Sequence, residues 1–294
     1  MRKRQPILMT LIFSTWLNAS HASQADNIDI KLTFDEFLLP NAHLRINDQS
    51  MVLNIDTGSS FAFHLTLEQI DALRAKKSTE KRRTIDAAGN VQENTLYSAE
   101  NLSLNGIKLR NATIVPLQQW GLMMSGVGEP PIAPAIGLGA FASKVLVLDY
   151  RNKSMSIADG MSDALLAGDR FSDYPFIHAP EGLIFNVEHA GSAYKLVLDS
   201  GASVSGVWDE RLNTQLREDC AIVDPELKIE GCKAVRLTAI SSNGTRDTFT
   251  AIALPGRFDH MEGVDGLLGN NFLKTRKVII DFANERLWVS EPST

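Results

Sequence analysis

Apolar residues along this chain fall into short runs separated by turn-forming residues such as Gly, Asn and Asp. Short runs rich in aliphatic and β-branched residues are typical of β-strands. The run 145–150 is apolar without interruption, which predicts a strand buried on both faces. Strands and hairpins are predicted for residues 24–55, 84–91 (with its tip at 88–90), 102–109 and 145–150.

The helical patterns are few and short. Thr66 can cap a helix, because Gln69 stands three residues later in the position of a capping box. This helix is predicted to run to about Lys77, and residues 76–83 are expected to form a charged, solvated connection. A second short helix is predicted for residues 210–216. The chain is therefore expected to be mostly β.

One apolar run leads directly into a cluster of polar residues. Residues 52–55 are followed by Asp56, Thr57, Gly58 and Ser59. Gly58 permits a sharp turn that a residue with a Cβ would resist. The pattern predicts a strand that ends in a carboxylate at a tight turn. A single aspartate in such a turn is most simply a cap for the local backbone.

The same pattern returns at an offset of 143 residues. There the apolar run 194–198 leads into Asp199, Ser200, Gly201 and Ala202. The aspartate, the hydroxyl and the glycine keep their places, whereas Ser59 is replaced by Ala202. A capped turn alone does not explain why the whole pattern recurs.

A second, later match supports the repeat. Residues 135–157 align without gaps to residues 267–289, at an offset of 132. Two ordered matches indicate an internal duplication, and two units are too few for a solenoid. The resulting division is a first lobe at 23–158, a linker at 159–173 with a short helix at 162–167, and a second lobe at 174–294.

The first 22 residues predict a cleaved secretory signal. Arg2, Lys3 and Arg4 precede an apolar stretch at 6–17 that is too short to span a bilayer, and small residues precede a cleavage site after Ala22. An uncleaved anchor is the alternative. No later stretch reaches the roughly 18 apolar residues of a membrane span. The protein is therefore expected to be periplasmic or secreted.

Charge and cysteine content narrow the picture further. The net charge is −6, and it becomes −9 without the three basic residues of the signal, which argues against nucleic acid as a partner. Cys220 and Cys232 are the only cysteines. Export and their short separation favour a disulfide that closes a local loop. A metal site is not expected, because further ligands do not stand nearby and the histidines lack zinc-binding spacing.

Two copies of the turn can place Asp56 and Asp199 face to face. Like charges at close range do not both ionise easily, so such a pair shares a proton and titrates together. It then offers one general base and one general acid to a water molecule between them. Hydrolysis of a peptide bond is the natural reaction for this arrangement.

These features resemble aspartic proteases of the pepsin-like and retropepsin-like clan. The resemblance implies an all-β fold of two homologous β-barrel lobes with a few short helices and an active-site cleft between the lobes. It implies that Asp56 and Asp199 are catalytic, and that the Thr57 and Ser200 hydroxyls brace the two turns. The motifs that carry it are Asp56-Thr57-Gly58-Ser59, Asp199-Ser200-Gly201-Ala202, Ala135-Ile136-Gly137 and Leu267-Leu268-Gly269.

The resemblance also implies a function. It points to an aspartic endopeptidase that cleaves extended polypeptides as a monomer and needs no cofactor. Only 33 residues separate Ala22 from Asp56, so a large inhibitory pro-segment is not expected, and bacterial periplasmic members of the clan fit best. The alternative is a non-catalytic two-lobed relative that binds peptides or a protein partner in the cell envelope.

Two departures from the family pattern generate hypotheses. Ser59 can donate a hydrogen bond to Asp56, whereas Ala202 offers no such donor to Asp199, so we expect Asp56 to be the ionised member of the pair. The flap hairpin of pepsins carries a tyrosine, but the corresponding segment here reads Asp86-Ala87-Ala88-Gly89. Tyr97 lies further along, where a packing role between strands is the simpler interpretation.

Overall fold

The computed structural model describes residues 28–85, 91–118, 132–223, 230–255 and 263–293. The expected signal segment 1–22 and the flap candidates Asp86, Ala87, Ala88 and Gly89 lie outside these residues. Strands dominate the described part, as expected from the short apolar runs. Its α-helices are short: α1 (Leu67–Ala72), α2 (Asp163–Leu166) and α3 (Asn270–Leu273). None of its helices is long and apolar enough to cross a membrane.

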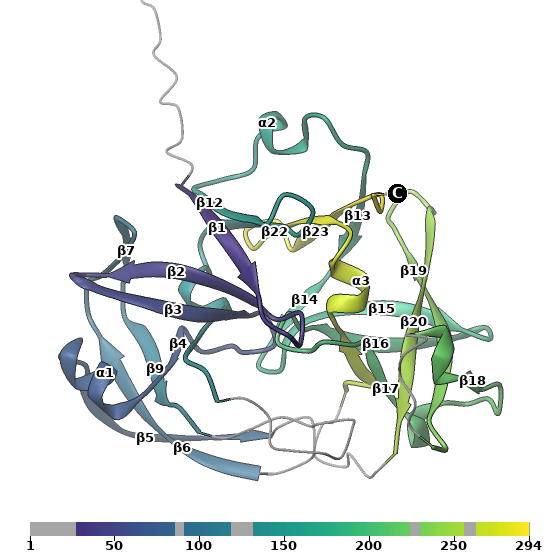
Figure 1. Ribbon diagram of the computed structural model, residues 1–294, viewed down its shortest axis with the longest axis horizontal. Helices are drawn as coiled ribbons and strands as arrows, with labels where there is room; N and C mark the ends of the chain where they lie inside the picture. Colours follow the sequence, from purple (N-terminus) through teal and green to yellow (C-terminus); the bar gives the residue numbers. More distant parts are fainter. Residues whose placement is uncertain (1–27, 86–90, 119–131, 224–229, 256–262, 294) are drawn as a thin grey trace, which may run out of the picture.

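The first half of the chain forms a series of β-strands, most of which pair antiparallel with their neighbours (Figure 1). A 3-10 turn, η1 (Leu138–Ala140), follows the tenth strand. The strands are β1 (Ile28–Phe34), β2 (Pro40–Ile46), β3 (Gln49–Asp56), β4 (Phe63–Leu65), β5 (Lys76–Ile85), β6 (Val91–Ala99), β7 (Leu102–Leu104), β8 (Ile107–Leu109), β9 (Ala112–Pro116), β10 (Ala135–Gly137), β11 (Val145–Asp149) and β12 (Ser154–Ala158).

The second half repeats this plan with a shorter set of hairpins. Two 3-10 turns, η2 (Asp209–Arg211) and η3 (Cys220–Ile222), interrupt it. The strands are β13 (Phe171–Pro175), β14 (Ile177–Ala179), β15 (Gly182–His189), β16 (Ser192–Leu198), β17 (Gly206–Trp208), β18 (Glu218–Asp219), β19 (Lys233–Ile240), β20 (Arg246–Leu254), β21 (Gly266–Leu268), β22 (Lys277–Asp281) and β23 (Arg286–Ser290).

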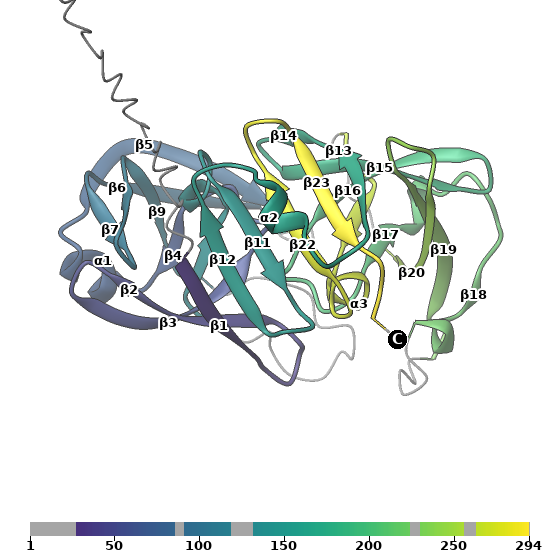
Figure 2. The same cartoon turned by 90° about the horizontal axis from the view of Figure 1, so that it is seen from above.

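A central sheet joins the two halves. The order β13-β23-β22-β11-β12-β1 brings strands from both halves side by side, with β11 and β22 antiparallel at the junction. Figure 2 shows these strands between the blue first half and the green second half. Strand β1 pairs with β12 at its start and with β2 at its end, so it leads from the central sheet into the first lobe.

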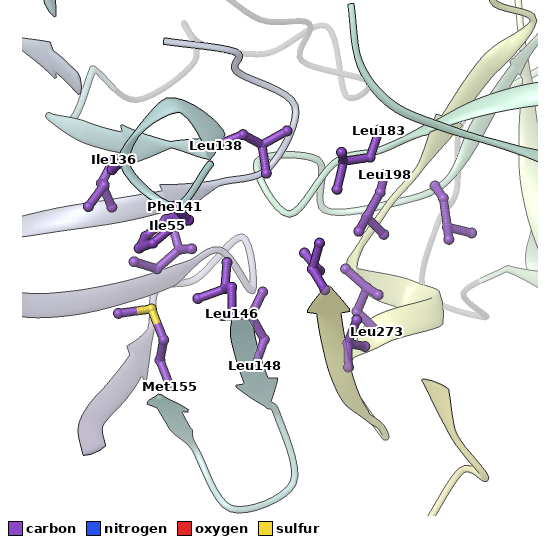
Figure 3. Close-up of a cluster of buried hydrophobic side chains, with 14 of the residues drawn as sticks. Ile55, Ile136, Leu138, Phe141, Leu146, Leu148, Met155, Leu183, Leu198 and Leu273 are labelled. Atoms are coloured by element: carbon purple, nitrogen blue, oxygen red, sulfur yellow. The ribbon is translucent and has the colours of Figure 1, made fainter. Parts of the chain in front are cut away.

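The main hydrophobic core continues across this junction. Every residue of β11 is buried, which confirms the prediction of a strand covered on both faces. Figure 3 shows Ile55 and Leu198, the residues that precede the two aspartates, in the same cluster as Leu146 and Leu148 of β11. The two aspartate turns therefore start from strands whose side chains share one packed interior, which limits how far either turn can shift.

Several local predictions are confirmed. Thr66 and Gln69 form the reciprocal hydrogen bonds of a capping box at the start of α1. The hairpin β7–β8 turns at Asn105 and Gly106, which both have positive φ angles (47° and 95°). A turn of this kind suits Asn-Gly, because neither residue pays the steric cost that a larger side chain would. The hairpin of β5 and β6 is also present, with Ile85 opposite Val91.

Other predictions are wrong. The connection expected at 76–83 is part of β5, and α1 ends at Ala72 instead of near Lys77. Strand β5 lies at the edge of its sheet, where charged side chains protect a free edge from pairing with other chains. A strand with this role lacks apolar alternation, which explains the error. The helix expected at 210–216 is reduced to the turn η2.

The linker prediction matches the structure only in part. Helix α2 falls within the expected short helix at 162–167. However, β13 begins at Phe171, inside the segment expected to be a linker, and pairs along its length with β23. The polar residues of β13 are typical of a linker, but this strand forms the edge of the central sheet and is held there by backbone pairing with β23.

The disulfide between Cys220 and Cys232 is present, as predicted. Cys220 is buried beside Trp208 and Leu254 in a small cluster of the second half. A cross-link over a sequence separation of 12 residues restricts the unfolded chain and so favours the folded one. It fixes η3 against the start of β19.

We expect the double variant Cys220→Ala/Cys232→Ala to lower the free energy of unfolding by about 2–4 kcal/mol, because the unfolded chain regains the entropy of the open loop. Urea unfolding of both proteins measures the difference. Treating the wild type with a reductant should give a similar loss. An unchanged midpoint would show that the cross-link does not restrain the unfolded chain.

Candidate active site

The two aspartate turns have the same backbone geometry. Asp56 ends β3, and its Oδ1 accepts a hydrogen bond from the Gly58 N–H at 3.0 Å. Asp199 follows β16, and its Oδ1 accepts from the Gly201 N–H at 2.8 Å. In each turn the residue three positions after the aspartate donates its N–H back to the aspartate carbonyl at 3.3 Å. The duplication seen in the sequence is thus a duplication of the turns.

A short strand crosses behind each turn. β10 pairs in parallel with β3, and β21 pairs in parallel with β16 in the same way. The next residues close the arrangement: the Leu138 N–H donates to the Ser59 carbonyl and the Asn270 N–H donates to the Ala202 carbonyl, both at 2.8 Å. A Cβ on Gly269 would lie 2.6 Å from the backbone of Val204, so glycine is required where the segments cross.

Thr57 and Ser200 tie the two turns together. The Thr57 N–H donates to the Ser200 hydroxyl at 3.0 Å, and the Ser200 N–H donates to the Thr57 hydroxyl at 2.9 Å. Each hydroxyl also donates across to the opposite half, Thr57 to the Leu198 carbonyl at 3.0 Å and Ser200 to the Ile55 carbonyl at 2.6 Å. These crossing bonds are buried and fix the distance between the halves.

The arrangement brings the two carboxyl groups together. They share a side-chain hydrogen bond. A Cβ on Gly201 would lie 3.0 Å from the Asp56 Oδ1 and 3.1 Å from the Asp199 Oδ1, and a Cβ on Gly58 would lie 2.6 Å from the Asp199 Cγ. Both glycines are therefore needed to leave room for the pair. The catalytic role of these residues stays a prediction.

Burial and mutual repulsion change how the pair titrates. Desolvation raises the pKa of Asp56 well above its ordinary value, and the nearby Asp199 raises it further. Desolvation also raises the pKa of Asp199, but to a smaller extent, because the Gly201 N–H and the Asp56 carboxyl stabilise its charged form. The pair therefore keeps one proton over a range that reaches toward neutral pH.

Ser59 does not make the contact that we expected. Its hydroxyl lies 2.6 Å from the His64 Nε2 and accepts the Phe61 N–H at 3.3 Å. The Ser59 backbone N–H donates a hydrogen bond to Asp56, and the Ala202 backbone N–H donates one to Asp199 in the same way. Burial lowers the pKa of His64 to about 3, so its ring is neutral. The expectation that a Ser59 hydroxyl bond makes Asp56 the ionised member is therefore not supported.

The flap candidates Asp86, Ala87, Ala88 and Gly89 lie outside the described residues. Tyr97 is half-buried in β6 opposite Ile114 and packs against the core, which agrees with its expected packing role. An open groove of about 880 Å³ is lined by residues of β8 and η1, and the two aspartates do not line it. This groove is therefore not the expected cleft between the lobes, which stays a prediction.

Sequence reading missed three buried polar residues near the pair. They are His64 beside Ser59, and Tyr150 and Asn270 beside Ser200. For Tyr150 and Asn270 a signal was available in the second repeat match, because polar residues stand there opposite the apolar Phe282 and Leu138. In the described residues no group of three or more His, Cys, Asp or Glu could hold a metal ion.

Comparison with known proteins supports the fold. The chain is similar to a solved aspartic proteinase from Irpex lacteus, with a TM-score of 0.52 and 12% sequence identity over 91% of this chain and 98% of that one. At this identity the likeness concerns the fold alone. Protein-family models give no match, and neither do curated proteins. The expected all-β, two-lobed aspartic protease fold is confirmed.

We expect Thr57→Val to lower the free energy of unfolding by about 2–4 kcal/mol, because it leaves the Ser200 N–H and the Leu198 carbonyl without their buried partner. Thr57→Ser keeps the hydroxyl and should cost about 1 kcal/mol. Urea unfolding measures both. A loss for Thr57→Val no larger than that for Thr57→Ser would mean that the crossing bonds support the turn no more than the methyl group does.

The raised pKa values make stability depend on pH. The folded protein binds protons on the pair more tightly than the unfolded chain, so wild-type stability falls as pH rises from the unfolded value of about 4 through the folded values. Asp56→Asn removes one charge from this pair. As pH rises from 4 to 8, we expect the free energy of unfolding of this variant to increase by on the order of 2 kcal/mol relative to that of the wild type.

Chemical unfolding at the two pH values measures this gain. Asp48→Asn is the matched control, because Asp48 is exposed in the turn between β2 and β3. A constant difference between Asp56→Asn and wild type at both pH values would contradict the raised pKa of Asp56.

Proposed function

We propose that this protein is an aspartic endopeptidase that hydrolyses peptide bonds in extended polypeptides. The observation that carries the proposal is the close pairing of a buried Asp56 with a half-buried Asp199, one from each half of the duplicated fold. A chain gains nothing in stability from placing two carboxyl groups in one buried space, because at least one of them resists ionisation. Such pairs are characteristic of acid–base sites.

A singly protonated pair supplies both functions that hydrolysis needs. The carboxylate takes a proton from a water molecule, and the water oxygen bonds to the carbonyl carbon of the substrate. The carboxylic acid gives its proton to the carbonyl oxygen. In the tetrahedral diol that results, the carboxyl group that took the water proton gives it to the nitrogen as the C–N bond breaks. One diol hydroxyl passes its proton to the other carboxylate as the carboxyl product forms, so the pair is again singly protonated. This sequence requires no cofactor.

The site is complete within one chain, which supports a monomer as the active form. Both aspartates, both glycines and both bracing hydroxyls come from the same polypeptide. A polypeptide lying between the lobes would meet both aspartates, which is the basis for proposing an extended substrate. Nucleic acid is not proposed as a partner, given the net charge of −6.

We also propose that the protein is exported, to a periplasmic or extracellular location. The basic start and short apolar stretch within residues 1–22 support this, as does the disulfide between Cys220 and Cys232, which suits an oxidising compartment. The bacterial periplasmic type of the clan remains the proposed subtype on the same grounds.

The second candidate function is a non-catalytic protein that binds a peptide or protein partner with the same surface. One sequence observation favours it: Asp86 stands where pepsins carry the flap tyrosine. Loss of a flap residue affects how substrate is held, whereas the aspartate pair itself is intact. Hydrolysis and binding assays on the same variants separate the two functions.

We expect the wild type, without residues 1–22, to cleave denatured protein substrates with a pH optimum above the acid range of isolated carboxyl groups, because both pKa values are raised. Asp56→Asn and Asp199→Asn should each lower the rate by at least about 100-fold. Fragments are quantified by mass spectrometry over a series from acid to neutral pH.

Asp48→Asn serves as the control for loss of an exposed carboxylate and should retain full activity. Circular dichroism verifies that all variants fold. If the wild type and both dyad variants cleave alike, the pair is not the catalyst. If none cleaves but the wild type retains a labelled peptide, the binding function is the better explanation.

A further inference from the structure

A buried hydrogen-bond chain reaches the Asp199 turn from the other half of the protein. The Tyr150 hydroxyl donates to the Asn270 Oδ1 at 2.9 Å. The Asn270 Nδ2 in turn donates to the Ser200 carbonyl at 2.8 Å. Asn270 is fully buried and Tyr150 nearly so. Tyr150 follows β11 in the first half, and its own N–H is fixed by the Arg276 carbonyl at 3.1 Å.

The chemistry of the partners fixes the direction of this chain. The Ser200 carbonyl can only accept, so the Asn270 side chain must present its NH₂ group there. Its oxygen then faces Tyr150, which must donate. Desolvation and the nearby Asp199 raise the pKa of Tyr150 far above the usual range, so the hydroxyl keeps its proton. Every link therefore points from Tyr150 toward the Ser200 carbonyl.

The last link runs through a single peptide group. The Ser200 carbonyl and the Gly201 N–H belong to the same amide, and that N–H donates to the Asp199 Oδ1 at 2.8 Å. A hydrogen bond to the carbonyl of an amide polarises it and makes its N–H a stronger donor. A stronger donor favours the ionised form of the carboxyl group that accepts from it.

Among the described residues, the Asp56 turn has no equivalent of this chain. In the repeat, Leu138 stands at the position of Asn270 and Phe282 at the position of Tyr150. Leu138 is buried but has no polar atom to offer to the Thr57–Gly58 amide. The Gly58 N–H still donates to the Asp56 Oδ1, at 3.0 Å, without support of this kind. The two carboxyl groups thus receive matching backbone donors of unequal strength.

We propose that Tyr150 and Asn270 are positioning residues that act through the Ser200–Gly201 amide and make Asp199 the carboxylate of the pair, while Asp56 holds the shared proton. Within the proposed function, on which this consequence rests, Asp199 then takes the proton from water and Asp56 protonates the substrate carbonyl. The sequence alone had suggested the reverse assignment.

The surroundings of the pair are consistent with this assignment. Among the described residues, each aspartate is the one titratable group that shifts the pKa of the other, and Asp199 raises the pKa of Tyr150. His64 contacts Ser59, not Asp56, in the hydrogen bonds of the site, and burial lowers its pKa so that the ring is neutral. The pKa of Asp199 is raised less than that of Asp56. No charged group on a neighbouring described element is needed to explain the difference.

The test observes each carboxyl group alone. In an Asp56→Asn background, the ¹³C NMR signal of the labelled Asp199 carboxyl reports its titration, and an Asp199→Asn background reports Asp56. We expect Tyr150→Phe to raise the pKa of Asp199 by roughly 0.3–1 unit, as suits the loss of one hydrogen bond in the chain, and to leave Asp56 unchanged. Asn270→Leu should have a larger effect of the same sign.

Because the links act in series, Tyr150→Phe should add nothing to Asn270→Leu. Tyr174→Phe is the matched control, since Tyr174 is a buried tyrosine of β13 whose pKa does not depend on Asp199. It should shift neither carboxyl group. Tyr150→Phe changes only a hydroxyl, so the test does not depend on whether Asn270→Leu folds. Equal shifts of both aspartates, or no shift of either, would overturn the proposal.

This outcome is independent of activity. If the wild type cleaves polypeptides, the acid limb of its pH profile should move upward in Tyr150→Phe, because Asp199 must lose its proton to act as base. Cleavage with an unchanged limb and unchanged titration would remove the role of Tyr150 and leave the proposed function intact. A selective shift in the pKa of Asp199 without cleavage would support the role of Tyr150 and remove the proposed function.

Discussion

The structure depends on holding two carboxyl groups in one buried space. Left alone, the buried Asp56 and the half-buried Asp199 would push their turns apart or draw water between them, because desolvation disfavours the charge of each carboxyl group. The crossing bonds of Thr57 and Ser200 oppose this. They join amide and hydroxyl of one turn to those of the other, so separating the carboxyl groups means breaking a set of buried hydrogen bonds together.

The rest of the fold makes this arrangement stiff. Strands β10 and β21 pass behind the turns, and the pairing of β11 with β22 prevents the halves from sliding past each other. The shared core beneath them links the strand that ends in Asp56 to the strand that Asp199 follows. A site that must hold a proton between two groups needs such support, because a small displacement changes both pKa values.

Sequence patterns predicted the fold class, the duplication and the paired turns, because these follow from local apolar runs and from motifs that occur twice. They failed where tertiary contacts determine the secondary structure or the partner of a side chain. The edge position of β5 hid a strand behind a run of charges, and the partner of the Ser59 hydroxyl proved to be His64 instead of Asp56. The hydrogen bond between Tyr150 and Asn270 joins residues that are 120 positions apart, so no local pattern predicts it.

Duplication within a single chain has a consequence for the evolution of such a site. In a symmetric dimer of identical chains, every substitution appears twice, so both carboxyl groups keep the same neighbours and only the position of the proton distinguishes them. Here Leu138 and Asn270 occupy matching places and are encoded separately. Substitutions in one copy can therefore favour the protonated form of its aspartate while substitutions in the other favour the ionised form. A mutation in one lobe can change the pKa of one carboxyl group without an identical change around the other.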